Sequence, residues 1–167
     1  EKDVANLHLN KKDKIAYVTQ TTLSVDDTKS IVLAIKKKYP NIIEPKKKDI
    51  CYATTNRQEA VKKIANNCDL FIVIGAKNSS NSIRLVEVAR QYGAKKSILA
   101  NSAEQFNLQL LNNIKNVGLT ASASAPEILV QNFIKHIKTN FNVIVYEKNY
   151  IKEDVFFKIP LQLKIAN

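Results

Sequence analysis

Four short segments of the chain are rich in small side chains that form hydrogen bonds. They are residues 19–22, 51–56, 78–82 and 120–124, and each follows an expected strand or precedes an expected helix. In open α/β sheets, ligands bind at such turns, where helix N-termini offer free N–H groups and a positive dipole end that favour phosphate. One capping residue per helix would satisfy the structure. The surplus, clearest at residues 78–82, indicates an anionic, phosphorylated ligand.

The two cysteines lie seventeen positions apart, which makes neither a disulfide framework nor a zinc site. Cys51 stands directly before an expected helix, where the helix N-terminus stabilises a thiolate. It is therefore a candidate metal ligand or nucleophile, with a small buried apolar side chain as the alternative. Cys68 has no comparable polar cluster around it, and we expect it to be structural. The carboxylates are scattered, and their spacing identifies no acid–base pair.

The composition excludes several classes of protein. Of the 167 residues 45% are hydrophobic, which suits a folded core and excludes a disordered chain. The apolar runs are too short to span a membrane, and the polar start has no signal-peptide pattern. Three glycines exclude a dinucleotide-binding fingerprint and a P-loop. We expect a cytoplasmic protein without a membrane segment and, since the chain starts at Glu1 and has no methionine, a fragment.

The formal net charge of +11 permits a second function, a non-catalytic basic module that binds phosphate or nucleic acid. However, 23 of the 26 basic residues are lysine, whereas proteins that contact DNA bases in the grooves rely on arginine. Lysine on solvated faces explains the same composition. The charge alone therefore leaves this alternative open. Our main expectation is a protein without a nucleic-acid partner.

Expected strands alternate with expected helices along the chain. Strands are expected at residues 14–18, 69–74, 96–100, 116–120 and 143–146, with a further one at 155–159. This alternation predicts an α/β fold built of βαβ units with a mostly parallel sheet. Residues 41–49, which contain a proline and a lysine run, form the expected junction between two domains.

The helices are expected from their capping signals. Ser24 with Asp27 forms a capping box, and Thr55 with Gln58 has the same pattern. A third helix is expected to end at Gly93. Residues 103–113 are expected to be helical, and a last helix is expected to start at residue 126 and run to about residue 139.

Four motifs resemble, in order, the hydroxymethylbutenyl diphosphate reductase family, an iron–sulfur enzyme that ends the methylerythritol phosphate route to isoprenoids. They are residues 19–27, 50–61, 77–82 with 84–85, and 123–126. The resemblance implies that residues 1–45 end the family's middle α/β domain. Residues 46–148 would then form a complete third α/β domain, and residues 149–167 a tail. The first half of this three-domain enzyme would be absent.

The resemblance also implies roles for individual residues. Cys51 would be one of three cysteine ligands of a 4Fe–4S cluster, the other two lying outside this chain. Thr21 would stand beside the substrate hydroxyl and its proton relay. The diphosphate would be bound by Ser79, Ser80, Asn81 and Ser124. Two positions depart from the family pattern, since Ser122 replaces a glycine and Ala76 a serine. Ser122 is expected to stiffen the turn that carries Ser124.

The implied reaction converts 4-hydroxy-3-methylbut-2-enyl diphosphate into isopentenyl and dimethylallyl diphosphate by reductive loss of the hydroxyl group. The implied partners are this allylic diphosphate and an electron donor of the ferredoxin or flavodoxin type. An acidic donor would suit a basic surface. We expect a monomeric parent enzyme and, because a single matching cysteine cannot hold the cluster, no activity of this chain alone.

Overall fold

The computed structural model describes residues 1–10, 13–46, 49–148, 150 and 159. Its main unit is a sheet of three parallel strands, β1 (Leu70–Ile74), β2 (Lys96–Ala100) and β3 (Val117–Ala121), in the order β2-β1-β3. This confirms the predicted α/β fold. Every residue of β1 is buried, as expected of a central strand that is covered on both faces.

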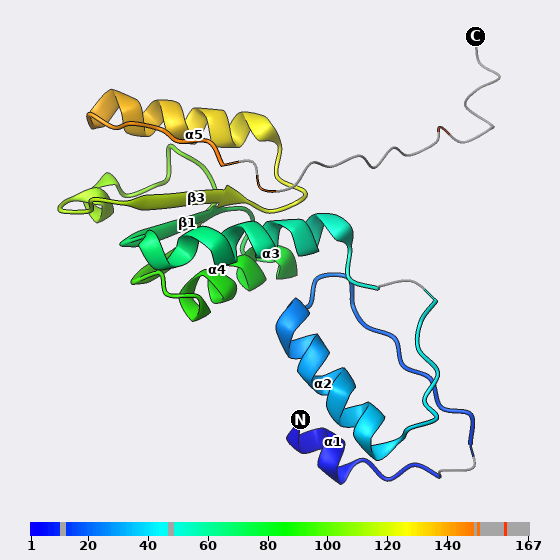
Figure 1. Cartoon of the computed structure of the whole chain (residues 1–167). Coiled ribbons are helices and arrows are strands. Elements are labelled where there is room, and N and C mark those ends of the chain that lie inside the picture. Colours follow the sequence, from blue (N-terminus) through cyan, green and yellow to red (C-terminus); the bar gives the residue numbers. More distant parts are fainter. Residues whose placement is uncertain (11–12, 47–48, 149, 151–158, 160–167) are drawn as a thin grey trace.

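Helices cover both faces of the sheet (Figure 1). α3 (Tyr52–Ile64) and α4 (Ser80–Gln91) pack on one face, and α5 (Glu127–Asn140) packs on the other. The side chains of β1 alternate between the two layers, because Phe71 packs against the α3 and α4 side while Ile72 packs with Phe133 of α5. A short 3₁₀ helix, η1 (Ala65–Asn67), connects α3 to β1.

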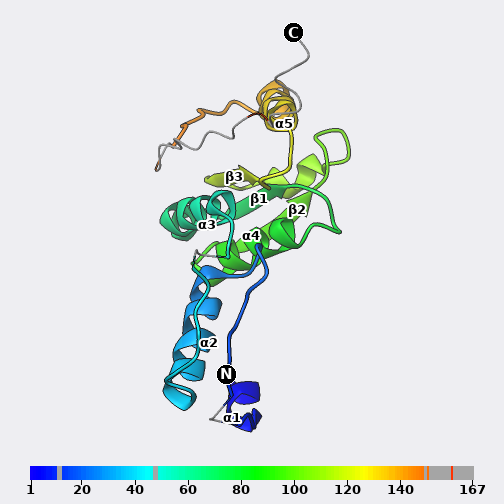
Figure 2. The same cartoon turned by 90° about the vertical axis from the view of Figure 1, so that its right-hand side faces the viewer.

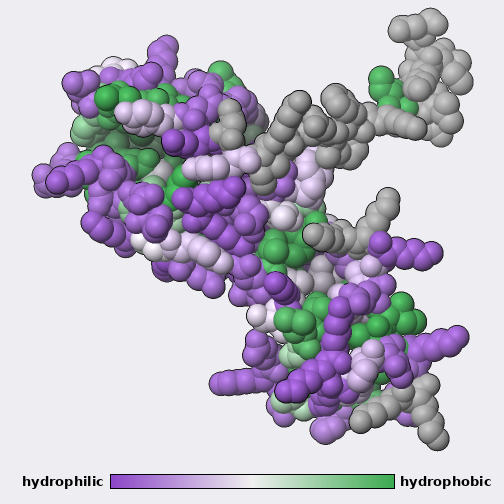
Figure 3. Space-filling view, in the orientation of Figure 1, coloured by the Kyte–Doolittle hydropathy of each residue, from purple (hydrophilic) through white to green (hydrophobic). Residues whose placement is uncertain are grey.

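Residues 1–10 and 13–46, here called the front segment, form a second part beside the sheet unit (Figure 2). They contain α1 (Lys2–Asn6) and α2 (Val25–Lys38). The predicted capping box at Ser24 is confirmed, since its Oγ accepts a hydrogen bond from the Asp27 N–H at 3.2 Å. No side chain of α2 is buried. Apolar residues are exposed on this part of the surface (Figure 3). Val18 and Leu33 are two of the exposed apolar residues of the front segment.

Several predicted elements are wrong or shortened. Residues 14–18 do not form a strand, because Ala16 makes only an isolated parallel bridge with Ile43, and no further strand within the described ranges extends it. Residues 143–146 form no strand either and are exposed. The helix expected over residues 103–113 is reduced to the 3₁₀ helix η2 (Leu108–Leu111). Residues 155–158 of the last expected strand, and most of the tail, lie outside the described residues.

The predicted capping box at Thr55 and Gln58 is also wrong. α3 starts earlier, with Cys51 as its N-cap residue, so both side chains lie inside the helix. Gln58 is fully buried there and serves a different purpose, described below. The other helix ends agree with prediction, because Gly93 follows α4 with a φ of +100° and α5 starts directly after Pro126. None of the helices in the described ranges has the length and apolar character needed to cross a bilayer.

Candidate functional site

The carboxyl ends of β1 and β3 lie side by side and bring two of the polar turns together. Ile74 and Ala121 are paired in the parallel register, and the N–H of Ser122 then donates to the carbonyl oxygen of Ile74 at 2.9 Å. The turn after β1 leads into α4, and the turn after β3 leads into α5. α3 runs into the amino end of β1, so its own N-terminus points to the same edge. Three helix N-termini therefore surround this edge of the sheet.

Gly75 allows two hydroxyl groups to approach the backbone at this edge. A Cβ at Gly75 would collide with Ser82 Oγ and would lie 3.1 Å from Ser122 Oγ. Ser82 is fully buried, and Ser122 is 2% exposed. Only a residue without a side chain fits here, so Gly75 keeps the two turns in close contact.

Asn81 and Ser82 carry the strongest indication of a ligand. The Asn81 side chain is buried, yet neither its Oδ1 nor its Nδ2 has a hydrogen-bond partner among the described residues. The Oγ of Ser82 also lacks a partner there. Leaving a buried polar group unpaired costs about 1–3 kcal/mol, so native proteins rarely do so without a reason. All three atoms lie in the first turn of α4. An anion there would accept hydrogen bonds from Asn81 Nδ2 and Ser82 Oγ, whereas Asn81 Oδ1 can only accept.

The other residues that the resemblance assigned to a diphosphate lie at the same edge. Ser79 is the N-cap residue of α4, and its Oγ accepts from the Ser82 N–H at 3.3 Å. Ser80 is the first residue of α4 and is exposed. Ser124 is exposed in the turn that starts at Ser122. Sequence reasoning did not select Ser82 as a contact. Its position within the polar run was visible, but its unpaired state was not.

Thr21 and Cys51 are joined through their backbones, because the Cys51 N–H donates to the Thr21 carbonyl oxygen at 3.1 Å. Both residues are exposed, and the Cys51 thiol is free. Its side chain makes no capping hydrogen bond to α3. In contrast, Cys68 is buried and its Sγ donates to the Ile64 carbonyl oxygen at 3.2 Å. Burial raises the pKa of the Cys68 thiol, and the nearby Asp69 adds to this shift.

Gln58 attaches the Thr21 region to the sheet unit. Its Oε1 accepts from the Val25 N–H at 3.0 Å, and its Nε2 donates to the Leu23 carbonyl oxygen at 2.9 Å. Both contacts are to main-chain atoms between Thr21 and the first turn of α2. The Gln58 amide therefore holds the backbone at Leu23 and Val25. The Cys51 N–H holds the same stretch two residues before Leu23, at Thr21.

Charged side chains strengthen this attachment. Lys62 forms ion pairs of 2.8 Å with Asp26 and with Glu59, and Tyr92 donates to Asp26 as well. Hydrogen bonds from Lys62 and from Tyr92 lower the pKa of Asp26. Burial alone would lower the pKa of Lys62, but its hydrogen bonds to Asp26 and Glu59 outweigh that effect and raise it. Arg84 also reaches across, with its guanidinium 3.7 Å from Asp27.

Cys51 is the described residue that the resemblance assigns to an iron–sulfur cluster. No group of three or more His, Cys, Asp or Glu side chains within the described ranges could hold a metal ion. Cys51 itself fits the part of a single ligand, since its thiol is free, exposed and placed at the N-terminus of a thirteen-residue helix. Cysteine sulfur is the usual protein ligand of such clusters. If Cys51 binds a cluster, no complete set of ligands stands beside it among the described residues.

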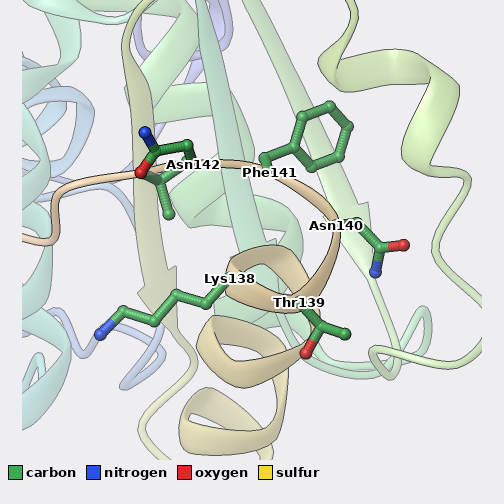
Figure 4. Close-up of a pocket in the computed structure, with 6 residues that line it drawn as sticks. Lys138, Thr139, Asn140, Phe141 and Asn142 are labelled. Atoms are coloured by element: carbon green, nitrogen blue, oxygen red, sulfur yellow. The ribbon is translucent and has the colours of Figure 1, made fainter.

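A surface pocket lies away from this site. It is lined by Lys138, Thr139, Asn140, Phe141, Asn142 and Val143 (Figure 4). They belong to the last turn of α5 and the three residues after it, whereas the polar turn that carries Ser124 lies at the N-terminal end of α5. The pocket contains none of the residues singled out above, and its shape alone does not make it a candidate.

The chain is similar to proteins of one known family. The profile of the family described as LytB protein matches residues 1–138. A protein of Actinobacillus succinogenes named 4-hydroxy-3-methylbut-2-enyl diphosphate reductase is 48% identical over 163 residues, which are 98% of this chain and 52% of that protein. The protein of the same name from Wigglesworthia glossinidia brevipalpis is also 48% identical, over 96% of this chain and 51% of that protein.

The chain is also similar to a solved structure of a protein with this kind of name. The E-1-hydroxy-2-methyl-but-2-enyl-4-diphosphate reductase from Plasmodium falciparum is 41% identical, with a TM-score of 0.77. The match covers 82% of this chain and 43% of that one. The chain therefore spans about half the length of the curated relatives that it matches.

Proposed function

The chain belongs to the LytB family, and we propose that its protein reduces 4-hydroxy-3-methylbut-2-enyl diphosphate to isopentenyl and dimethylallyl diphosphate. Two electrons and two protons remove the hydroxyl group as water and leave the diphosphate intact. The names of the similar proteins favour this activity over a basic module that binds nucleic acid. The residues of this chain would bind the diphosphate and supply one ligand of the redox centre.

The unpaired amide of Asn81 is the observation that carries the proposal. A diphosphate at the first turn of α4 would accept hydrogen bonds from Asn81 Nδ2 and Ser82 Oγ, which have no partner among the described residues. The hydroxyls of Ser80 and Ser124, both exposed at this edge, would add two further donors. The positive end of the α4 dipole favours the same anion. These residues would fix the orientation of the carbon chain relative to Cys51.

Cys51 and Thr21 would act at the other end of the substrate. Cys51 would hold one iron of a 4Fe–4S cluster, which when bound would pass on two electrons from the donor, one at a time, and offer a Lewis-acidic iron for the substrate hydroxyl. We assign to the exposed Thr21 hydroxyl the role of holding the substrate hydroxyl and passing it a proton. The 3.1 Å backbone bond between these residues supports the assignment, because it keeps the two side chains on neighbouring stretches of chain.

An acidic electron donor of the ferredoxin or flavodoxin type completes the proposal. The sequence carries 26 basic against 15 acidic residues, and a field of this sign accelerates the encounter with an acidic protein. The rate of electron delivery would then fall as ionic strength rises.

The test uses the intact protein, because this chain contributes a single cysteine to the cluster. Anaerobically prepared protein should reduce the substrate, and Asn81→Ala should raise KM about tenfold or more while changing kcat far less. Asn132→Ala, which removes an exposed amide from α5, is the matched control and should leave KM unchanged. Absence of reduction by the wild-type protein with its cluster loaded would refute the proposed activity. An unchanged KM in Asn81→Ala would refute the diphosphate assignment.

A further inference from the structure

Arg57 connects the helix that carries Cys51 to the end of β3. Its Nε donates a hydrogen bond of 3.0 Å to the carbonyl oxygen of Ala121, the last residue of that strand. Arg57 is half-buried, and in the part of the chain that the structure describes no carboxylate forms an ion pair with it. Neutralising a carboxylate therefore does not explain its position.

With the hydrogen bond from Arg57, both the C=O and the N–H of the peptide group between Ala121 and Ser122 have a partner. The N–H and C=O of a trans peptide point in opposite directions. On one side, the Ser122 N–H donates to Ile74 on β1. On the other side, the Ala121 carbonyl faces away from β1, at the outer edge of β3. Edge carbonyls ordinarily bond water, but here a charged donor occupies the position, and such hydrogen bonds are stronger than neutral ones.

This peptide begins the turn that carries Ser124. The turn closes with a 3.0 Å hydrogen bond from the Ala125 N–H to the Ser122 carbonyl oxygen, and α5 starts two residues later. The Ser124 side chain is exposed and makes no hydrogen bond to the rest of the described chain. Its position therefore depends on the backbone of the turn, which depends in part on the peptide that Arg57 holds.

We propose that Arg57 is a positioning residue that ties the turn of residues 122–125 to α3, and so fixes Ser124 relative to Cys51. The inference rests on the proposed function for the role of Ser124 in binding diphosphate. Arg57 lies six residues after Cys51 on one rigid helix, so the two ends of the substrate would be held by a single element. Loss of Arg57 should loosen the diphosphate end without removing a ligand of the cluster.

The first measurement is amide hydrogen exchange in the intact protein, with Arg57→Met compared with wild type. We expect exchange of the Ser122 and Ala125 amides to become about tenfold faster or more. The amides of β1 should stay protected, which separates a local loosening from general unfolding. Arg90→Met, which removes an exposed arginine from the last turn of α4, is the matched control for loss of charge. It should leave all these rates unchanged.

The second measurement is the affinity for inorganic pyrophosphate by calorimetry, followed by KM and kcat. Arg57→Met should weaken pyrophosphate about tenfold and raise KM by a similar factor, with kcat changed less than about threefold. Arg57→Lys retains a cationic donor and should recover part of the affinity. If the Ser122 and Ala125 amides of Arg57→Met exchange at the wild-type rate, the proposal is overturned. It is also overturned if the amides throughout β1 lose protection equally in Arg57→Met and Arg57→Lys. If exchange changes as expected but the wild-type protein reduces no substrate, the proposed function fails and the structural role of Arg57 stands.

Discussion

The Cys51 N–H donates a hydrogen bond of 3.1 Å to the carbonyl oxygen of Thr21. The bond joins the residue expected to bind iron with the residue expected to contact the substrate hydroxyl. It uses main-chain atoms alone, so both side chains remain available. The front segment and α3 therefore meet through a contact that mutation of either side chain leaves in place.

Replacement of Cys51 should separate cluster binding from folding. Cys51→Ala in the intact protein removes an exposed thiol and should abolish both the iron–sulfur absorption and turnover. The melting temperature of the apoprotein should stay close to wild type, since exposed substitutions change stability within about 0.5 kcal/mol. Cys68→Ala is the matched control. It removes a buried thiol and should lower the melting temperature while leaving the cluster intact. Normal iron content in Cys51→Ala would contradict the assignment.

Ser82→Ala should stabilise the ligand-free protein and weaken ligand binding. The Ser82 hydroxyl is buried without a partner among the described residues, so its removal relieves a cost of about 1 kcal/mol or more. We expect a melting temperature a few degrees higher and a weaker affinity for pyrophosphate. Ser97→Ala provides the contrast, because that buried hydroxyl donates to the Val86 carbonyl oxygen at 2.9 Å and its loss should lower the melting temperature. A lower melting temperature in both variants would refute the interpretation of Ser82 as a ligand-binding group.

Gln58→Leu should detach the front segment from the sheet unit. The substitution keeps the volume but leaves the Leu23 carbonyl and the Val25 N–H without their partner, at a cost of about 2–4 kcal/mol. Thermal unfolding and amide exchange at Val25 and Cys51 measure the effect. Gln91→Leu, at an exposed position near the end of α4, should be neutral. Unchanged exchange at both amides would show that other contacts hold the segment.

Asp69 should make the stability of the protein depend on acid pH. Hydrogen bonds from the Lys95 ammonium and from the Asn116 and Lys115 N–H groups lower the pKa of Asp69 to about 2. A carboxyl group whose pKa is lowered on folding stabilises the protein fully above its unfolded pKa of about 4, and this stabilisation is lost as pH falls toward the folded value. Asp69→Asn should therefore lower the melting temperature at pH 7 and flatten its decline between about pH 4 and pH 2. Asp3→Asn, at an exposed position of α1, should change neither the melting temperature at pH 7 nor its decline in acid.

Local patterns predicted the sheet unit well. The apolar run of β1 identified that strand, β2 was expected at the residues where it lies, and Ser24 and Gly93 marked two helix ends. A strand at residues 14–18 was predicted from the same kind of pattern, but a strand forms only when neighbours pair with it. The described residues supply just the bridge to Ile43.

The sequence indicated where the polar turns lie but not the contacts that their side chains make. Small polar side chains at the turns indicated an anion, and the structure brings the turns after β1 and β3 to one edge. The spacing of Thr55 and Gln58 suggested a cap, whereas Gln58 pairs with backbone atoms more than thirty residues away. Which hydroxyl lacks a partner, as at Ser82, depends on packing that spacing does not contain. The roles of Thr21, Ser79, Ser80, Asn81, Ser124 and Cys51 in the reaction stay predictions.

The hydrogen bonds between Gln58 and the front segment determine which positions of this region can change in sequence. Its amide bonds to a carbonyl and an N–H, groups that nearly every amino acid provides in the same form. Residues 23 and 25 can therefore drift between species without weakening this junction, and proline at position 25 is the exception, because it has no N–H to offer. Position 58 has no such freedom, since only a side chain that both donates and accepts can replace glutamine there.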